Sequence, residues 1–311
     1  MQNFYSNGKL LITGEYVVLD GALSLALPTK FGQSLDIEAI NESKIIWKSF
    51  DENGNIWFED SFELDTNMML KQVQHDEEIS KRIIQILNAT KTLNPDFLNT
   101  TNGFKISTKL TFPKNWGLGT SSTLINNVAN WAHVDAYKLL DKTFGGSGYD
   151  IACAQNNLPI TYQLQPFDCA QGDKRKINSV NFKPKFKDCL YFVYLNQKQN
   201  SRDGIANYKS NKGNITSAVS EINDITNKMI ECTNLMDFDS LIIHHETIIS
   251  KIIKQQTVKS LLFNDYNGSV KSLGAWGGDF ALATSEENPT AYFKDKGFDV
   301  VIPYDNMILS N

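Results

Sequence analysis

The sequence contains no long apolar run and few cysteines, and both absences narrow the class of protein. No segment approaches the roughly 18 uninterrupted apolar residues of a membrane-spanning helix. The N-terminus lacks the basic patch and apolar core of a secretory signal. Cys153, Cys169, Cys189 and Cys232 match no zinc-binding spacing, and four cysteines in 311 residues do not form a disulfide framework. We therefore expect a cytoplasmic protein with reduced cysteines and no membrane partner.

Positive charge is also in deficit. The chain has 30 Lys and Arg against 35 Asp and Glu, a formal net charge of -5. A mildly acidic surface argues against a protein that wraps nucleic acid or lies on anionic lipid. It still permits a local basic pocket for a small anion. The oligomeric expectation is a monomer or homodimer.

The apolar pattern predicts a mixture of strands and helices without strict alternation, which favours an α+β fold over a doubly wound sheet. Strands are expected at 10–12, 16–19, 23–27, 104–110, 189–195, 280–284 and 299–302, with a hairpin over 43–62. Helices are expected at 81–93, 121–140, 214–233, 238–256 and 289–296, and near Tyr149. The chain turns polar and basic after Gln165, so we expect an N-terminal domain of residues 1–185 and a C-terminal domain of residues 186–311.

The most informative segment, here the second motif, is the loop Pro113–Gly119 followed by the hydroxyl residues Thr120, Ser121 and Ser122. A strand leads into this loop and a helix leaves it. A helix N-terminus presents unpaired N–H groups and a partial positive charge, and glycine lets that backbone approach a phosphate closely. The alternative is an ordinary junction in which the hydroxyls cap the helix. The segment is neither a Walker A loop nor a dinucleotide-binding fingerprint.

Two further segments carry recognisable glycine patterns. The first motif contains Gly8-Lys9 and Gly14-Glu15-Tyr16, and the third motif is Gly274-Ala275-Trp276-Gly277-Gly278. In this order, the three motifs resemble the signature of the GHMP kinases, the superfamily of galactokinase, homoserine, mevalonate and phosphomevalonate kinases. The resemblance spans essentially the whole chain. A tyrosine after Gly-Glu is similar to the phosphomevalonate kinase branch, since mevalonate kinases usually carry histidine there.

The chain departs from the family pattern at four positions. Asn7 replaces the usual proline of the first motif, and Thr120 and Ser122 replace a serine and an alanine of the second. Trp276 replaces the central glycine of the third motif, which places a bulky residue where the family's backbone approaches the ligands.

A fourth segment, Ser147-Gly148-Tyr149-Asp150, resembles the family stretch that carries the catalytic aspartate. With the next two residues it reads Gly-Tyr-Asp-Ile-Ala, as in the GYDIA subgroup of the GHMP kinases. The resemblance implies that Asp150 is the general base and that Lys9 is its partner. A carboxylate beside an ammonium stays ionised and oriented, and the ammonium stabilises charge on the transferred group. Taken singly, Asp150 is better explained as a helix cap and Lys9 as an exposed strand lysine.

The resemblance also implies the binding residues. ATP would be held by Pro113, Gly117, Leu118, Gly119, Thr120, Ser121 and Ser122, with Ser121 as the protein ligand of Mg²⁺. The acceptor would be held by Glu15, Tyr16, Ser147, Gly148, Arg202, Gly274, Ala275, Gly277 and Gly278. The glutamate that mevalonate kinases place about eleven residues before the base corresponds to Leu139 here, so the acidic Mg²⁺ ligand stays open between Asp135 and Asp141.

The implied fold is a two-domain GHMP kinase fold, with a ribosomal-protein-S5-like N-terminal half and a ferredoxin-like C-terminal half. ATP and a small acceptor would bind in the cleft between them. The implied reaction is transfer of the ATP γ-phosphate to a hydroxyl or phosphate, with phosphomevalonate or mevalonate as first choice. The alternatives are a sugar or homoserine kinase, a diphosphomevalonate decarboxylase, and a degenerate protein that binds without turnover.

Overall fold

The computed structural model describes residues 1–64, 71–72, 77–99, 102–165, 175–197 and 201–309. The chain divides into two compact units that interleave in the sequence. Unit 1 contains residues 1–8, 31–114 and 118–155, and unit 2 contains residues 9–30, 115–117 and 156–311. This division differs from the contiguous one expected at residue 185, because Ser24–Ala26 pair with a strand at residues 160–162 and so belong with the later part of the chain.

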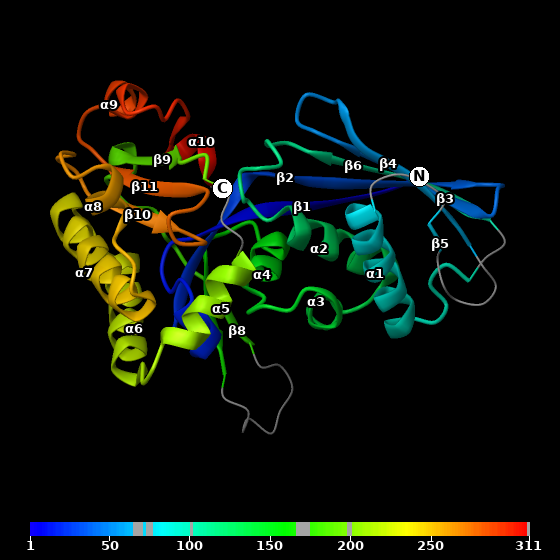
Figure 1. Cartoon of the computed structure of the whole chain (residues 1–311), viewed down its shortest axis with the longest axis horizontal. Coiled ribbons are helices and arrows are strands. Elements are labelled where there is room, and N and C mark those ends of the chain that lie inside the picture. The colour runs from blue at the N-terminus through cyan, green and yellow to red at the C-terminus, as the bar shows by residue number, and fades with distance from the viewer. Residues whose placement is uncertain (65–70, 73–76, 100–101, 166–174, 198–200, 310–311) are drawn as a thin grey trace. The chain divides into compact units, whose positions relative to one another are not determined.

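Unit 1 is a mixed sheet with helices on one side of it (Figure 1). Its strands are β1 (Gln2–Leu11) and β2 (Ser24–Ile40), which both continue into unit 2, and β3 (Lys44–Phe50), β4 (Ile56–Glu63), β5 (Lys71–Gln72) and β6 (Gly103–Leu110). Its helices are α1 (Glu77–Leu93), α2 (Thr120–Ala132), α3 (Ala136–Thr143) and α4 (Tyr149–Gln155). The strand order is β5-β4-β3-β6-β2, with β3 and β6 parallel and the other pairs antiparallel.

The strands of unit 1 follow the alternating pattern seen in the sequence. Residues of β3 alternate between half-buried and buried, because successive side chains of a strand point to opposite faces. Ile45 and Trp47 of β3 are buried, as are Phe62 of β4 and Ile106 of β6. The predicted hairpin over 43–62 is confirmed, with Ile45 opposite Phe62 in the antiparallel register.

One predicted helix is two helices in the structure. The segment expected at 121–140 ends as α2 at Ala132 and resumes as α3 at Ala136. His133 adopts a left-handed conformation with φ 53°, which ends α2. Asp135 then caps α3, since its carboxylate accepts hydrogen bonds from the amides of Tyr137 and Lys138. The apolar pattern runs through this break because buried residues stand on both sides of it, Trp131 and Ala132 before it and Ala136 and Tyr137 after it.

Unit 2 is built on a four-stranded antiparallel sheet with the order β10-β11-β9-β12. The strands are β9 (Leu190–Tyr194), β10 (Val270–Leu273), β11 (Phe280–Thr284) and β12 (Val301–Pro303). Its helices are η1 (Val17–Asp20), η2 (Lys187–Cys189), α5 (Ser201–Asn211), α6 (Thr216–Glu231), α7 (Leu235–Ile253), α8 (Val258–Leu262), α9 (Thr290–Asp295) and α10 (Tyr304–Met307). Outside this four-stranded sheet, Ser24–Ala26 of β2 pair antiparallel with β7 (Ile160–Leu164), and β7 pairs antiparallel with β8 (Arg175–Ser179), so the strand order that ends above at β2 continues as β2-β7-β8.

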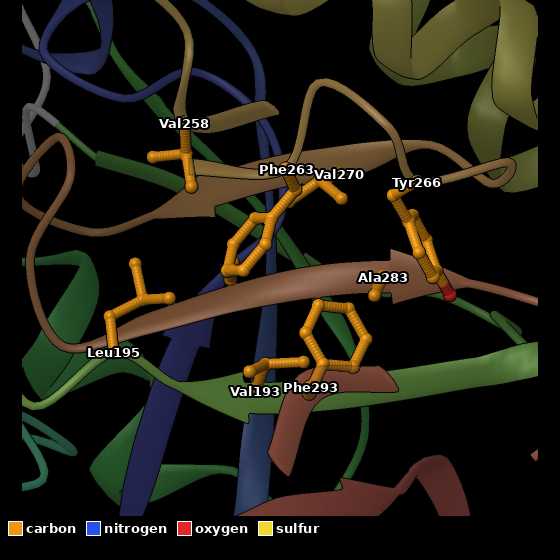
Figure 2. Close-up of a cluster of buried hydrophobic side chains, with 9 residues drawn as sticks. Val193, Leu195, Val258, Phe263, Tyr266, Val270, Ala283 and Phe293 are labelled. Carbon is orange, nitrogen blue, oxygen red and sulfur yellow. The ribbon is translucent and has the colours of Figure 1, made fainter. Parts of the chain in front are cut away.

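The topology of this sheet confirms the expected ferredoxin-like half. After β9 the chain forms helices, then the hairpin of β10 and β11, and then α9, which leads to β12. The chain order is therefore β-α-β-β-α-β. Figure 2 shows the apolar cluster on one face of the sheet, where Phe263 and Phe293 pack edge to face with ring centroids 5.1 Å apart. Val193 of β9 and Ala283 of β11 belong to the same cluster.

Candidate active site

The second motif leads into α2 through Gly119, which makes no side-chain capping hydrogen bond. Gly119 occupies the N-cap position in a left-handed conformation with φ 99°. A glycine has no side chain to accept hydrogen bonds from the first-turn amides, unlike the serine or aspartate usual at this position. The predicted helix start is therefore confirmed, and no hydroxyl occupies its N-cap.

The hydroxyls behind Gly119 point to different partners. The Ser122 Oγ donates to the Gly119 carbonyl oxygen at 2.9 Å, and the Thr123 Oγ1 donates to the Gln33 Oε1 at 2.8 Å. Both side chains are buried, whereas Ser121 is exposed. The interpretation that these hydroxyls merely cap α2 is wrong, because the two buried ones donate to oxygens and no hydroxyl residue stands at the N-cap. What is left at the surface is a positive helix end with a hydroxyl in its first turn.

Asp150 lies in the first turn of α4, in the same unit as α2. The chain reaches it through Gly146 and Gly148, which have φ 109° and 90° and therefore need glycine. The two helices pack together, and the Gln155 Nε2 donates to the Asn126 Oδ1 at 2.9 Å. Asp150 is half-buried, and its Oδ1 is buried without a hydrogen-bond partner among the described residues. Because a buried carboxylate oxygen is costly to leave unpaired, this atom fits a ligand hydroxyl or a cation.

The alternative reading of Asp150 as a helix cap is not supported. A capping residue precedes the helix and accepts from its first amides, as Asp135 does for α3. Asp150 is instead the second residue of α4, preceded in the helix by Tyr149, and one of its oxygens has no donor among the described residues. Ser147 and Gly148 precede the helix, and both are buried.

Residues 115–117 of the second motif belong to unit 2 and pack on its sheet. The Trp116 ring meets Phe280 of β11 edge to face at 5.5 Å between centroids, and the Tyr194 hydroxyl donates to the Asn115 carbonyl oxygen at 3.1 Å. The Lys9 Nζ donates to the Gly117 carbonyl oxygen at 2.9 Å. The first and second motifs are thus joined in unit 2, and Lys9 is more than an exposed strand lysine.

Gly117 is required by both its conformation and its neighbour. Its φ is 65°, and a Cβ at this position would lie 1.6 Å from the Asp279 Oδ2. Any other residue would displace the Asp279 side chain or the loop. Asp279 follows the third motif directly, so the second and third motifs approach each other closely within unit 2.

The first motif contains a tight turn where the sequence predicted a strand. Gly14 has φ 88°, and Tyr16 has φ 62° and ψ −49°. The Val17 amide donates to the Glu15 carbonyl oxygen at 2.7 Å, which makes Tyr16 the centre of a γ-turn of the rare, strained form. The strand expected at 16–19 is wrong, because the turn redirects the chain into η1.

Glu15 lies in a buried cluster of charged and polar side chains. Its Oε1 accepts a hydrogen bond from the Lys271 Nζ, and its Oε2 lies 3.2 Å from the His245 Nε2. The Lys271 Nζ also lies 3.5 Å from the Glu246 Oε1. Neither Glu15 nor Lys271 has exposed side-chain surface, so Glu15 has no surface with which to touch an acceptor. No sequence motif marks the other members of this cluster, which are His245, Glu246 and Lys271.

Burial controls the protonation of this cluster. It raises the pKa of Glu246 to about 8, against the lowering effect of the Lys271 ammonium. It also raises the pKa of Glu15, again opposed by Lys271, and lowers the pKa of His245 well below its usual value. The His245 Nε2 accepts a hydrogen bond from the Gly14 amide at 3.0 Å, which requires the neutral ring. The adjacent pair His244-His245 gave no sequence signal for this role.

The third motif is bound to Tyr16 of the first. The Trp276 amide donates to the Tyr16 Oη at 3.0 Å, and the Gly277 amide donates to the Ser272 Oγ at 2.8 Å. The Trp276 side chain is 5% exposed, and its indole N–H donates to the Gln256 carbonyl oxygen at 2.8 Å. The bulky residue that the sequence placed among the ligands therefore packs in the interior of unit 2. Gly274, Ala275, Gly277 and Gly278 lie in the turn between β10 and β11.

The remaining predicted residues divide between the units. Leu118 is fully buried at the start of the unit 1 part of the second motif, and Pro113 and Thr120 are half-buried there. Arg202 lies in α5, but its side chain is outside the described residues. The proposed pairing of Lys9 with Asp150 joins residues of different units and stays a prediction.

The described residues form no group of three or more His, Cys, Asp or Glu side chains able to hold a metal ion. Asp135, one candidate for an acidic Mg²⁺ ligand, uses a carboxylate oxygen to cap α3. Within the same described part of the chain, no helix is both long and apolar enough to cross a membrane.

No protein-family model and no curated protein matches this chain. Solved structures match it along its whole length. The mevalonate kinase of Methanococcus jannaschii aligns with a TM-score of 0.68 and 16% identity, covering 100% of this chain and 98% of that one. The phosphomevalonate kinase of Streptococcus pneumoniae, in complex with phosphomevalonate and AMPPNP, aligns with a TM-score of 0.68 and 16% identity, covering 100% and 99%.

A third similar structure is a D-glycero-D-manno-heptose 1-phosphate kinase from Bacteriodes thetaiotaomicron, with a TM-score of 0.64, 15% identity and coverage of 98% and 95%. The chain has the fold of the GHMP kinases. The α+β fold class expected from the sequence is confirmed. In this GHMP fold, the three glycine motifs of the sequence fall at the start of α2, at the γ-turn and in the β10–β11 turn.

Proposed function

We propose that this protein is a GHMP-type kinase that transfers the γ-phosphate of ATP to a small-molecule acceptor. The observation that carries the proposal lies in unit 1. The start of α2 has a glycine in place of a capping side chain and an exposed Ser121, and α4, which packs against α2, presents the unpartnered buried Oδ1 of Asp150. An uncapped helix start is suited to a phosphate, and an unpaired carboxylate oxygen is suited to a reacting hydroxyl.

The residues present fit ATP and Mg²⁺. When bound, ATP supplies the phosphoryl group and Mg²⁺ neutralises part of its charge. The first-turn amides of α2 would hold phosphate oxygens, and the exposed Ser121 hydroxyl would hold the metal. Lys9 already donates to the Gly117 carbonyl oxygen, which fixes the loop before those amides. The complex of the similar phosphomevalonate kinase with AMPPNP supports ATP as the nucleotide.

Asp150 would act on the acceptor. With a hydroxyl acceptor, its Oδ1 would accept the hydroxyl proton as the acceptor oxygen bonds to the γ-phosphorus and the bond from that phosphorus to the ADP leaving group breaks. A phosphate acceptor is a dianion at neutral pH and has no such proton to give. The dependence of the rate on Asp150 therefore distinguishes the two acceptor classes.

Phosphomevalonate and mevalonate are the first acceptors to test. The similar structures include kinases named for mevalonate and phosphomevalonate, and Glu15-Tyr16 resembles the phosphomevalonate kinase branch. A sugar or sugar phosphate is the second candidate class, because a heptose 1-phosphate kinase and a galactokinase in complex with galactose have the same fold. We further propose a cytoplasmic enzyme that acts as a monomer or homodimer and requires neither nucleic acid nor a membrane.

The test is an acceptor screen with Mg-ATP and the purified protein. ADP release is measured against mevalonate, phosphomevalonate, galactose, a heptose phosphate and homoserine, and the product is identified by phosphorus NMR. We expect one acceptor to be phosphorylated in a one-to-one ratio with ADP. Release of CO₂ from diphosphomevalonate would instead establish a decarboxylase. ATP binding without turnover of any acceptor would favour a degenerate binding protein, and absence of ATP binding by calorimetry would refute the nucleotide assignment.

A further inference from the structure

Three of the five backbone amides of the third motif donate hydrogen bonds to oxygens of the protein. The Trp276 amide donates to the Tyr16 Oη at 3.0 Å, the Gly277 amide to the Ser272 Oγ at 2.8 Å, and the Gly278 amide to the Ala275 carbonyl oxygen at 2.8 Å. Glycine-rich loops bind phosphate through amides that are free to point at it. Three consecutive amides of this loop are satisfied internally, so the loop is held in one conformation without a ligand.

Tyr16, which accepts the hydrogen bond from the loop, is itself fixed by contacts with α5. Its ring stacks on Tyr208 of α5 with centroids 5.6 Å apart and an interplanar angle of 22°. A Cβ on Gly204, one turn earlier in α5, would lie 2.7 Å from the Tyr16 Oη, so only glycine leaves room for the hydroxyl there. The strained γ-turn centred on Tyr16 persists because these contacts determine it, and backbone strain of this kind concentrates at functional sites.

The buried cluster fixes the strand that enters the third motif. Lys271, in β10, is bound to Glu15 of the first motif, 256 residues away in the sequence. The next amide, that of Ser272, donates to the Glu246 Oε2 of α7 at 3.1 Å. The hydroxyl of the same Ser272 then accepts from Gly277. Two adjacent residues of β10 therefore connect the first motif, α7 and the glycine turn.

We propose that the third motif is a clamped loop rather than a phosphate cradle, and that Tyr16, Ser272 and Lys271 are the positioning residues that clamp it. Tyr16 and Ser272 each hold one amide of the loop, and Lys271 holds the strand before it. The loop then offers the acceptor a fixed surface. Glu15 acts through Lys271 and not by touching the acceptor. The meaning of this clamp for catalysis rests on the proposed kinase function, but its existence does not.

The test of the clamp needs no substrate. Hydrogen–deuterium exchange at single-residue resolution is compared between the wild type, Tyr16→Phe and Ser272→Ala. Tyr16→Phe keeps the ring that stacks on Tyr208 and removes only the acceptor of the Trp276 amide. We expect exchange at Trp276 to rise at least tenfold in Tyr16→Phe, and exchange at Gly277 to rise similarly in Ser272→Ala. Tyr292→Phe is the matched control, since it removes a tyrosine hydroxyl that donates to Asp265 elsewhere in unit 2.

The kinetic part separates positioning from simple stability. On the acceptor identified by the screen, we expect Tyr16→Phe to lower kcat/KM for the acceptor about tenfold while the KM for ATP and the melting temperature stay near the wild-type values. Unchanged exchange in both Tyr16→Phe and Ser272→Ala would overturn the clamp even if the protein is a kinase. Faster exchange in a protein that turns over no acceptor would leave the clamp standing and refute the proposed function instead. Lys271→Met does not test the clamp, because it removes the counter-charge of the buried Glu15 carboxylate and so destabilises the whole unit.

Discussion

At the start of α2 the N-cap is a glycine and the exposed Ser121 lies beside the first-turn amides, whereas in the third motif three successive amides donate to protein oxygens. Both segments are glycine-rich, and a sequence pattern treats them alike. Their glycines nevertheless serve different ends. In the first region glycine leaves polar groups available, and in the second it allows a turn tight enough to satisfy them. A glycine motif therefore indicates an unusual backbone, and only the partners of its amides indicate a ligand.

The same contrast separates the two carboxylates that the sequence singled out. The Asp150 Oδ1 is buried without a hydrogen-bond partner among the described residues. The Glu15 Oε1 is bound to Lys271 in the interior of unit 2. One carboxylate is ready for a ligand, and the other is committed to the structure. The predictions below test this contrast.

Asp150→Asn is expected to have the largest effect on activity. Asparagine keeps the size of the side chain but cannot accept a proton, so kcat on a hydroxyl acceptor should fall by about 10²–10⁴. Affinity for Mg-ATP, measured by calorimetry, should change little because the proposed phosphate site is the first turn of α2 and not Asp150. Asp96→Asn, an exposed position of the same unit, is the control. A kcat within a few-fold of wild type on a hydroxyl acceptor would show that Asp150 is structural.

Lys271→Met is expected to have the largest effect on stability. It leaves the Glu15 carboxylate buried without its counter-charge, and breaking a buried pair in this way costs about 3–5 kcal/mol. The free energy of unfolding is measured by urea titration. Lys259→Met, which removes an ammonium bound to the Gly268 carbonyl oxygen, should cost much less.

The double variant Glu15→Gln, Lys271→Met sharpens this result. It removes both members of the pair, so it should recover part of the stability that Lys271→Met loses. If the double variant were less stable than Lys271→Met by the full effect of Glu15→Gln alone, the two side chains would not be coupled and the clustered arrangement would be refuted.

The sequence carried enough to predict the fold class and the position of each motif, but not the partners within the motifs. The hairpin and the start of α2 follow from local pattern, whereas the ferredoxin-like half was implied only by the resemblance to the GHMP kinases. The pairing of Lys271 with Glu15 does not, because it depends on tertiary folding that joins residues 256 positions apart. The signal that ends α2 was present in Asp135, a strong N-cap residue, but the apolar pattern on both sides outweighed it.

The helix α5 shows a different limit. Its sequence, SRDGIANYKSN, contains few apolar residues and no helical period, so nothing in it predicts a helix. The structure explains it through Tyr208, which is fully buried, stacks on Tyr16 and donates to the Asp20 Oδ2 at 2.6 Å. Tertiary contacts of this kind stabilise a helix that local propensity does not favour.

A smaller effect is expected from pH in unit 2. The groups that face Glu246 are Glu15, His245 and Lys271, and burial raises the pKa of Glu246 from about 4.5 to about 8. The folded state then binds a proton that the unfolded state has lost, so stability is highest below the unfolded pKa and falls as pH rises toward 8. His245 contributes a slope of the opposite sign, because burial lowers its pKa in the folded state, and this slope fades as pH rises above the unfolded histidine pKa of about 6.5.

Urea titrations at pH 6.5, 7, 7.5 and 8 test this directly. The wild type should lose stability across the series by more than Glu246→Gln, whose amide does not titrate. His244→Gln, which replaces the exposed neighbouring imidazole, is the control. If stability changed with pH by the same amount in the wild type and in Glu246→Gln, Glu246 would be ionised in the folded protein. The buried cluster around Glu15 and Lys271 would then contain an uncompensated negative charge.

The smallest effect on stability and activity is expected from Ser121→Ala at the start of α2. Ser121 is exposed in the first turn of α2, so losing its hydroxyl should leave the free energy of unfolding within about 0.5 kcal/mol of wild type. If that hydroxyl is a Mg²⁺ ligand, the Mg²⁺ concentration for half-maximal activity should rise about tenfold, which corresponds to roughly 1.4 kcal/mol. Ser121→Thr keeps the hydroxyl and should restore the wild-type value. An unchanged Mg²⁺ requirement in Ser121→Ala would remove Ser121 from the metal site and leave the amides of α2 as the only phosphate-binding groups proposed there.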